Sequence, residues 1–363
     1  AMFNEMLDGG GKRAIYEISN GLKNLGVIVD LYTTQKEENI SKGFFNKAYV
    51  YNFSVKKWQG RNWKRRLYKD TFEMKNLYLL HKKIAKDIDK KKYDFAFINS
   101  SQYIENPFIL RFLKTVSIIY CHDPHDRLIY DPLNKIPENL GVFRNIYERV
   151  FRFVRKIIDR QNINHADFLF ANSNYTKQII KKTYGLESEV VYLGVNEKDF
   201  FPYDQKKEND ILFIGSTSKL DGFDLYLKIL RLLPKKIRAK SVLAEQEWIR
   251  ETTALRSLYC RSKIILSLGI REPFGLIPLE GMSCGVPVIA VNEAGYKESI
   301  ANGKTGYLVK RNAKEIANKI TFLLNNETKR IQMGEEARRH ILNNWTWEKS
   351  IIHIHDLLLK KIK

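Results

Sequence analysis

Two glutamates eight residues apart, Glu272 and Glu280, stand in the apolar stretch REPFGLIPLEGMSCGVPVIA. The order of residue types predicts a strand end, a Pro-Phe-Gly turn and a short helix, because proline is tolerated in the first turn of a helix. Glu272 then lies in the loop and Glu280 on the helix. The N–H groups of Phe274, Gly275 and Leu276 point out of the helix N-terminus, where anions are favoured.

Two carboxylates beside an anion-binding helix N-terminus fit a ligand that carries both phosphate and hydroxyl groups. The alternative is structural, with Glu280 in a salt bridge and Glu272 as a helix N-cap. That alternative leaves the Pro-Phe-Gly turn unexplained.

The segment DGGGKR (8–13) could add a second anion seat. Gly10 and Gly11 let the backbone approach a ligand closely, and Lys12 or Arg13 could add positive charge. The spacing matches neither G-x-G-x-x-G nor a Walker loop. A purely structural turn is the alternative.

Two further loops follow predicted strands. CHDPHDR (121–127) places His122 and Asp123 where ligands bind in open α/β sheets, and its histidines lack the spacing of a zinc site. A polar contact to a substrate hydroxyl is favoured over a plain capped loop. FIGSTSKLDGF (213–223) offers Gly215, Ser216 and Lys219 to a phosphate, or else forms a helix N-cap.

The elements that position these loops alternate between short apolar runs and longer amphipathic stretches, which is typical of α/β layers on parallel sheets. A helix is expected over 13–26, and a segment at 238–258 has room for one strand and one helix. The opening AMFN is short for a first strand, so residues could be missing before it. Strands are expected at 27–33, 95–99, 116–121, 168–172, 190–194, 211–215, 263–268, 286–291 and 306–309. The 363 residues favour two doubly wound domains, joined near 195–209.

The net charge of +21 is unevenly distributed. Residues 51–100 hold 14 Lys/Arg against 5 Asp/Glu, whereas 251–300 hold 5 of each. Such an excess favours polyanionic partners, or else reflects solvated lysine-rich faces. The sequence shows neither an apolar run of the roughly 18–20 residues that cross a bilayer nor a signal-peptide pattern. Cys121, Cys260 and Cys284 lack metal-ligand spacing and fit a reducing cytoplasm.

Two basic segments are candidates for an anionic bilayer surface. The stretch 55–70 interleaves aromatic rings with cations, a combination that suits the headgroup region. Its residues include Lys56, Lys57, Trp58, Arg61, Trp63, Lys64, Arg65 and Arg66. The stretch VFRNIYERVFRFVRKIID (142–159) is the second candidate. Its alternative is a core-packed helix with a solvated face.

In this order the segments resemble family 4 of retaining glycosyltransferases, which have the GT-B fold of two Rossmann-like domains facing a central cleft. The resemblance covers nearly the whole chain and rests on the glycine loop, the His122 loop, the Glu272-x7-Glu280 pair and WTWEKSIIHIHDLL near the C-terminus. It implies an acceptor-side domain at 1–200, a nucleotide-sugar domain at 201–345 and a helix at 346–363 that returns to the first domain.

The resemblance also implies roles for these residues. Glu280 would hold ribose hydroxyls, and Glu272 would lie by the donor sugar with the backbone of residues 274–276. Gly10 or Gly11 would approach the diphosphate, and His122 would meet the sugar. The family needs no metal or other cofactor, so positive side chains and helix dipoles would neutralise the leaving diphosphate. The expected donor is a UDP- or GDP-linked hexose. Asp123 is the nearest candidate for a base, with a loop cap as its alternative.

One departure from the family pattern concerns the diphosphate. The family has an Arg after the strand-ending glycine and a Lys before the next one, and here Ser216 and Asp221 take those places. Lys219, Lys12 or Arg13 would have to substitute. We expect a cytoplasmic enzyme, peripheral at the membrane face, with a lipid-linked or glycan acceptor. The alternatives are a degenerate nucleotide-binding protein and a nucleic-acid-associated transferase or binding module, although no nucleic-acid motif is present.

Overall fold

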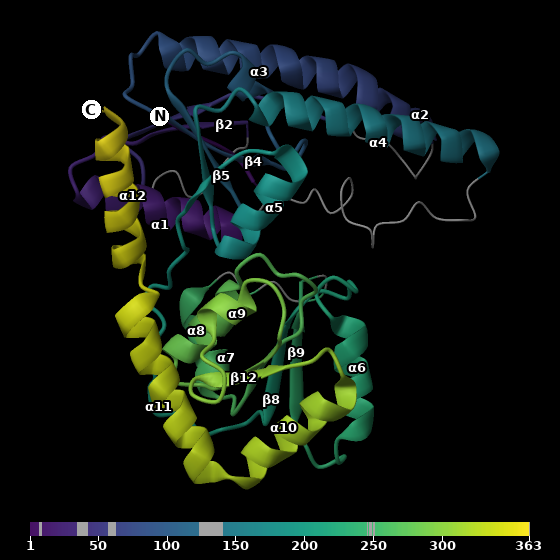
Figure 1. Ribbon diagram of the computed structural model, residues 1–363, viewed down its shortest axis with the longest axis vertical. Helices are drawn as coiled ribbons and strands as arrows, with labels where there is room; N and C mark the ends of the chain where they lie inside the picture. Colours follow the sequence, from purple (N-terminus) through teal and green to yellow (C-terminus); the bar gives the residue numbers. More distant parts are fainter. Residues whose placement is uncertain are drawn as a thin grey trace. The chain divides into compact units, whose positions relative to one another are not determined.

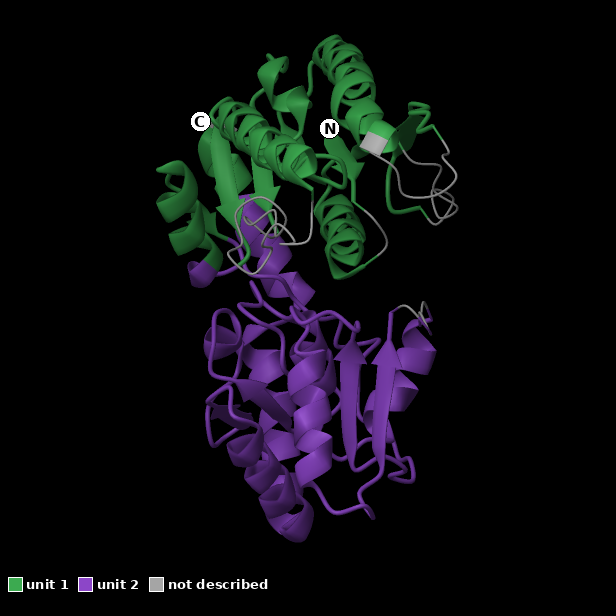
Figure 2. Cartoon of the chain, turned by 90° about the vertical axis from the view of Figure 1, so that its right-hand side faces the viewer, with its two compact units in different colours: residues 1–172, 176–190, 357–363 green, residues 173–175, 191–356 purple. Residues whose placement is uncertain are grey.

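The structure is a computed structural model that describes residues 1–6, 9–34, 43–56, 63–122, 141–244, 246, 249 and 251–362. The chain divides into two compact units (Figure 2). Unit 1 comprises Ala1–Asn172, Thr176–Val190 and Leu357–Lys363, and unit 2 comprises Ser173–Tyr175 and Val191–Asp356. The boundaries expected from the sequence are residues 200 and 345.

Within the described residues, unit 1 is built on a parallel sheet with the strand order β3-β2-β1-β4-β5-β6-β7. The order reverses beside β1, which pairs with β2 on one side and β4 on the other. Ligands bind beyond the carboxyl ends of strands at such a switch point. The strands are β1 (Met2–Glu5), β2 (Asp30–Thr33), β3 (Lys47–Val50), β4 (Ala96–Ser101), β5 (Ser117–Cys121), β6 (Phe168–Ala171) and β7 (Glu189–Val190).

Helices cover this sheet (Figure 1). Helix α1 follows the glycine loop and packs Ile15, Ile18 and Leu22 inward, a spacing of three to four residues that keeps one face of a helix on the core. The helical segments of unit 1 are α1 (Gly10–Asn24), α2 (Trp63–Tyr68), η2 (Lys69–Glu73), α3 (Met74–Asp89), η3 (Phe108–Arg111), α4 (Val142–Ile163) and α5 (Asn174–Tyr184).

Unit 2 holds a second parallel sheet with the order β12-β11-β10-β8-β9 in the part of the chain described. Its order reverses beside β8, so the loops after β8 and β10 lie at the switch point. The strands are β8 (Ile211–Gly215), β9 (Ala239–Leu243), β10 (Ile265–Ser267), β11 (Val288–Val291) and β12 (Gly306–Val309). The helices are α6 (Phe223–Leu232), α7 (Thr252–Cys260), α8 (Leu276–Ser283), α9 (Tyr296–Ser299), α10 (Ala313–Asn325), α11 (Glu327–Asn344) and α12 (Trp347–Ile362), and the last residues of α12, from Leu357 on, belong to unit 1.

The two doubly wound sheets confirm the predicted fold class. The segment 238–258 supplies one strand and one helix, β9 and α7, as expected. The opening residues, expected to be a fragment, form a strand that pairs on both sides. The sequence pattern does not predict β3, whose residues are exposed or half-buried.

Helix α4 corrects one expectation. The alternative in which residues 142–159 pack an apolar face into the core is wrong, because Val142 is 73%, Phe143 90% and Phe153 64% exposed. The face turned to the protein carries Glu148 and Asp159, both buried. Those acids find partners inside, with Glu148 paired to Arg66 and Asp159 to Asn106, so the polar face is the inward one.

Candidate functional site

The centre of the candidate site in unit 2 is helix α8. Glu280, in its second turn, is only 3% exposed, and the hydroxyl of Tyr259 on α7 donates a 2.8 Å hydrogen bond to its Oε2. Within the described residues, Gly275 gives α8 no side-chain cap, and the first turn holds no acid. The first N–H groups and the positive end of the helix dipole therefore suit an anion. Glu280 and this N-terminus come from one short element, as predicted.

Arg311 holds the loop that carries Glu272. Its guanidinium donates to the carbonyls of Leu268 (2.8 Å) and Gly269 (2.9 Å) and to both carboxylate oxygens of Glu293 (2.8 and 2.7 Å). Burial would raise the pKa of Glu293, but the Arg311 charge and hydrogen bonds outweigh it and lower that pKa. The Gly295 N–H donates to the carbonyl of Glu272 at 3.0 Å. The clamp thus fixes the backbone around Glu272, whose side chain is half-buried.

The Pro-Phe-Gly turn needs its glycine. Gly275 has φ of 91°, and a Cβ there would lie 2.6 Å from the Tyr296 ring. The Tyr296 pKa is raised well above its ordinary value, chiefly by burial and also by the nearby Glu272 carboxylate. Phe274 is buried and packs near the rings of Tyr192 and Trp345, at centroid distances of 5.9 and 5.6 Å. Its ring therefore anchors the turn, and residue 274 offers a ligand its backbone rather than its side chain.

The loop after β8 contains the two positions that depart from the family pattern. The Ser216 hydroxyl donates a hydrogen bond to the Asp221 carboxylate, so the two unusual residues are partners. The loop is tied to the Glu272 loop by a 2.6 Å hydrogen bond from the Ile270 N–H to the Leu220 carbonyl. Lys219, which lies between Ser216 and Asp221 in the sequence, is exposed. The loops after β8 and β10 and the start of α8 therefore form one cluster in unit 2.

In unit 1, α1 begins at Gly10, inside the glycine segment predicted as a loop. Gly9, its N-cap residue, makes no side-chain hydrogen bond within the described residues, and the first turn holds no acid. A Cβ on Gly11 would lie 2.3 Å from Cε of Met6 and 3.9 Å from Cγ of His122. The glycine loop and the His122 loop, predicted separately, are therefore neighbours. Lys12 is half-buried and Arg13 is exposed on the first turn.

His122 follows β5 and is buried, with 8% of its surface exposed. Burial lowers the pKa of its imidazole from 6.5 to about 4, so the ring is neutral at pH 7. Nε2 lies 3.5 Å from Oδ1 of Asn99, and Nδ1 has no hydrogen-bond partner among the described residues. Asn172 donates to the His122 carbonyl at 2.7 Å. A buried, unsatisfied ring nitrogen beside a glycine loop is a place for a ligand hydroxyl.

The basic stretch 55–70 is described in part. Lys57, Trp58 and Arg61 lie outside the described residues, as does Asp123. Lys64, Arg65 and Arg66 are exposed on α2, and Arg66 also pairs with Glu148 of α4 at 2.6 Å. Lys56 places its ammonium 5.4 Å from the Tyr68 ring centroid.

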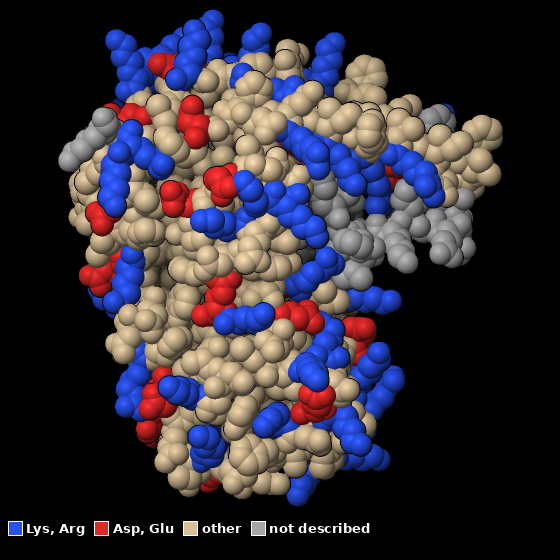
Figure 3. All heavy atoms as spheres, in the orientation of Figure 1, with Lys and Arg blue, Asp and Glu red and all other residues tan. Residues whose placement is uncertain are grey.

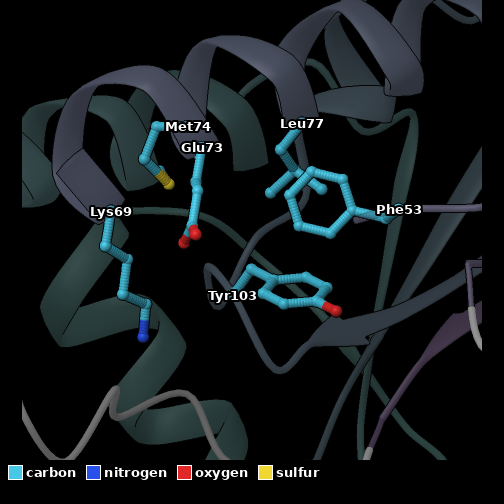
Figure 4. Close-up of a pocket in the computed structure, with 6 residues that line it drawn as sticks. All are labelled: Phe53, Lys69, Glu73, Met74, Leu77 and Tyr103. Atoms are coloured by element: carbon cyan, nitrogen blue, oxygen red, sulfur yellow. The ribbon is translucent and has the colours of Figure 1, made fainter. Parts of the chain in front are cut away.

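A small hollow lies beside this stretch, under η2 and α3 (Figure 4). Lys69, Glu73 and Tyr103 line it, together with Phe53, Met74 and Leu77. Phe53 and Tyr103 meet edge to face at 4.9 Å, and Glu73 accepts a hydrogen bond from the Lys56 N–H at 3.2 Å. The hollow therefore combines an aromatic wall with one charge of each sign.

Sequence reasoning missed several residues that shape these clusters. Tyr259 reaches Glu280 from another helix, and nothing in its sequence context marks it. Arg311 follows the carboxyl end of β12, so the rule for ligand sites in open sheets could have found it. Asn99 lies inside β4 (Ala96–Ser101), and its Oδ1 is 3.5 Å from Nε2 of His122. Among the described residues, His, Cys, Asp and Glu side chains form no group of three or more that could hold a metal.

Two doubly wound units, each with an uncapped helix N-terminus at a strand switch point, define a two-domain transferase fold of the GT-B type. A family model for glycosyltransferase family 4 matches residues 8–199, and one for group 1 glycosyl transferases matches residues 237–340. The chain belongs to glycosyltransferase family 4.

Known proteins agree with this assignment. Trehalose synthase from Thermococcus litoralis is 26% identical over 322 residues, covering 79% of this chain and 75% of that protein. Sucrose-phosphate synthase from Thermosynechococcus elongatus has the same fold, with a TM-score of 0.72, 14% identity and coverage of 99% of this chain and 98% of its own. The Anabaena protein HepE in complex with UDP-glucose gives a TM-score of 0.71 at 14% identity, with 99% and 98% coverage.

Proposed function

We propose that this glycosyltransferase moves a hexose from a UDP- or GDP-linked donor to a lipid-linked or glycan acceptor, with retention at the anomeric carbon. The observation that carries the proposal is Glu280, a carboxylate 3% exposed and held by Tyr259 one turn from an uncapped helix N-terminus. A hydroxyl-accepting group and an anion seat on one element match a nucleotide diphosphate. The UDP-glucose bound by HepE supports a uridine donor.

In this proposal Glu280 accepts hydrogen bonds from the ribose hydroxyls. The N–H groups at the start of α8 bind the diphosphate, and Glu272 accepts from the hydroxyls of the sugar. The Arg311 clamp on the Glu272 loop keeps these groups in place before the donor arrives, which lowers the entropy cost of binding.

The proposed reaction breaks the bond between the anomeric carbon and the leaving phosphate oxygen and forms a bond from that carbon to the acceptor oxygen on the same face. The acceptor proton passes to the leaving phosphate oxygen, so no enzyme nucleophile is required. His122, neutral at pH 7, offers its unsatisfied Nδ1 to a sugar hydroxyl. Asp123 is the proposed alternative proton acceptor.

Charge on the leaving diphosphate must be balanced without a metal in this proposal. Gly10, Gly11 and the start of α1 contribute N–H groups, and Lys12 or Arg13 contributes charge from unit 1. In unit 2 the backbone at Gly215 and the side chain of Lys219 serve the same purpose, in the absence of the family's Arg and Lys. The Ser216 hydrogen bond disperses part of the Asp221 charge that would otherwise oppose the diphosphate.

The acceptor side is proposed for unit 1, where Lys64, Arg65 and the exposed part of the 55–70 stretch give a basic surface. An anionic membrane surface is the proposed partner, on its cytoplasmic side, and nucleic acid is not. Cys121, Cys260 and Cys284 are free and buried, which supports a reducing compartment.

A thermal-shift screen with UDP, GDP, ADP and their sugars tests the donor, because a ligand that binds only the native state raises its melting temperature. One nucleotide should stand out, and Glu280→Gln should lose its shift. Glu336→Gln is the matched control, since Glu336 is exposed on α11 and pairs only locally with Arg339. An equal shift in both variants would refute the ribose assignment.

Turnover separates the transferase from a degenerate nucleotide-binding protein. With the selected donor and a mixture of lipid-linked and glycan acceptors, we expect transfer or slow donor hydrolysis, an α-linked product from an α-linked donor, and full activity in EDTA. Nucleotide binding without any turnover would support the degenerate alternative. Loss of activity in EDTA, restored by Mg²⁺ or Mn²⁺, would contradict metal independence.

A further inference from the structure

Helix α4 carries an exposed apolar row along most of its length. Its members are Val142, Phe143, Ile146, Val150, Phe153, Val154 and Ile157, each at least 40% exposed. At 100° per residue these seven side chains fall within an arc of about 120°. A continuous apolar row is much more than the scattered exposed side chains of an ordinary surface, and it marks a place that is covered in the working state.

The opposite face of α4 is occupied by polar contacts with the protein. Arg155 on this face donates to Asp70 of η2 at 3.0 Å, and the Tyr147 hydroxyl donates to the same carboxylate at 3.1 Å. Asp159 accepts from the N–H and side-chain amide of Asn106 at 3.0 and 2.8 Å. These contacts fix which face points outward, so the apolar row cannot turn inward without breaking them.

The charge that borders the row is positive. Both acids of α4, Glu148 and Asp159, are buried, so its exposed charges are basic. Arg149, Lys156 and Arg160 follow one edge of the row in the helical register. Figure 3 shows blue side chains gathered along α4 beside tan surface. The neighbouring helix α2 adds Lys64 and Arg65, both exposed.

We propose that the α4 row inserts into the headgroup and acyl boundary of an anionic lipid bilayer, with α4 lying in the plane of the surface. A helix with an apolar face, a basic border and low overall hydrophobicity has the properties of an interfacial helix. Its 22 residues span about 33 Å along the surface. Within the described residues no helix is long and apolar enough to cross a bilayer.

The charges favour lipid over a second copy of the chain. Two α4 helices packed row to row in antiparallel orientation would bring Arg149, Lys156 and Arg160 close to the same cations of the other copy, whereas anionic headgroups complement them. Phe72 on η2, 61% exposed, and Leu67 on α2, 37% exposed, add apolar surface to the elements that α4 packs on. Docking in this way rests on the proposed function in one respect: a lipid-linked acceptor requires the enzyme to work at a bilayer.

Vesicle sedimentation of the full chain tests the proposal. Vesicles of phosphatidylcholine with a third phosphatidylglycerol should bind the protein, and pure phosphatidylcholine should bind it at least tenfold more weakly. The double variant Phe143→Ser/Phe153→Ser should bind anionic vesicles at least tenfold more weakly than the native chain. Phe322→Ser/Ile331→Ser is the control, because Phe322 and Ile331 are exposed side chains of unit 2 (43% and 53%), and it should bind within twofold.

Insertion is separated from simple charge attraction by a fluorophore. The three native cysteines are buried, so a polarity-sensitive dye on Phe143→Cys or Phe153→Cys reports that position alone. The dye should report water without vesicles and an apolar environment with anionic vesicles. The same dye on Phe322→Cys should report water in both. A dye at 153 that is already shielded without lipid would mean that the chain itself or a second copy covers the row, and would overturn the proposal.

Two controls keep this proposal apart from the proposed function. The row variant must keep the nucleotide-induced thermal shift of the native chain, which also shows that it folds. Equal vesicle binding by the row variant and the native chain overturns docking through α4 and leaves donor binding intact. Vesicle binding without any nucleotide shift overturns the proposed function and leaves α4 docking intact.

Discussion

Helices α8 and α4 depart in opposite ways from the usual arrangement of apolar side chains inside and polar ones outside. Helix α8 is buried along most of its length and carries the Glu280 carboxylate inward, where Tyr259 donates to it. Helix α4 also buries two acids, but it turns seven apolar side chains outward. Each departure costs free energy unless a partner compensates for it.

The buried Glu280 of α8 has a hydrogen-bond partner, whereas the exposed apolar row of α4 has no partner in the described part of the chain. This difference suggests a different role for each helix. Inside unit 2 the polar group is held by a hydrogen bond and lies one turn from an anion seat, which is the property of a ligand site. On unit 1 the apolar row is left to water, which is the property of a docking surface. In our two proposals, donor binding and membrane docking therefore fall on two different elements, α8 and α4.

The largest expected effect is a difference in unfolding free energy between two truncations, one of a buried side chain on α8 and one of an exposed side chain on α4. Leu279→Ala on α8 should lower the free energy of unfolding by about 2–5 kcal/mol, because Leu279 is fully buried and leaves a cavity. Val150→Ala on α4 should change it by less than about 0.5 kcal/mol, because Val150 is half exposed. Urea unfolding measures both. Equal losses would mean that the α4 row is part of a core.

The next largest effect is a pH dependence of the unfolding free energy that arises from buried His122. Its folded pKa of about 4 lies below the ordinary 6.5, so the unfolded chain binds more protons between these values. The free energy of unfolding is therefore highest above pH 6.5, where His122 is neutral in both states. It falls by about 3 kcal/mol in total as the pH drops toward 4. His122→Gln should lack that slope, so the difference in unfolding free energy between the native chain and the variant should fall as the pH drops from 6.5 toward 4. An unchanged slope would place the His122 ring in water.

The Arg311 clamp should have an intermediate effect. Arg311→Met removes the guanidinium that holds Glu293 and two carbonyls. With the two side chains 25% and 30% exposed, we expect a loss of about 2 kcal/mol in unfolding free energy and weaker donor binding. Arg339→Met, which breaks a pair with 63% and 50% exposure, should cost less than about 0.5 kcal/mol. An equal loss of unfolding free energy in both variants would show that Arg311 does not hold the Glu272 loop in place.

The smallest expected effect concerns the unusual carboxylate in the loop after β8. Asp221→Asn keeps a hydrogen-bond acceptor for Ser216 and removes one negative charge. Repulsion between two unit charges in a water-like dielectric is on the order of 0.5–1 kcal/mol, so nucleotide affinity should rise about two- to fivefold. The gain should disappear in high salt. Weaker binding in the variant would instead give the carboxylate a direct role.

The sequence predicts most of the fold and the cluster around α8 because those features depend on local pattern. The apolar runs of β8, β10 and β11 and the glycine turns are visible in short windows. The Pro-Phe-Gly turn places Glu272 in a loop and Glu280 on a helix, as the structure has them. What α8 binds stays a prediction, since no ligand contact tests it.

The features that the sequence hides depend on contacts between distant segments. Tyr259 reaches Glu280 from 21 residues away, and Arg311 reaches Glu293 from 18 residues away. Helix α4 shows the limit most clearly, because its periodicity predicts an amphipathic helix but not which face is turned to the protein. That choice is made by partners outside α4, Asp70 on η2 and Asn106 in the segment between β4 and η3.

One crossed measurement tests the separation of donor binding from docking most directly. Nucleotide thermal shift and anionic-vesicle sedimentation are measured on the native chain, on Glu280→Gln and on Phe143→Ser/Phe153→Ser. We predict that Glu280→Gln loses the shift and keeps vesicle binding, and that the row variant loses vesicle binding and keeps the shift. A Glu280→Gln protein that keeps the native shift, or a row variant that still sediments with vesicles, would contradict the account.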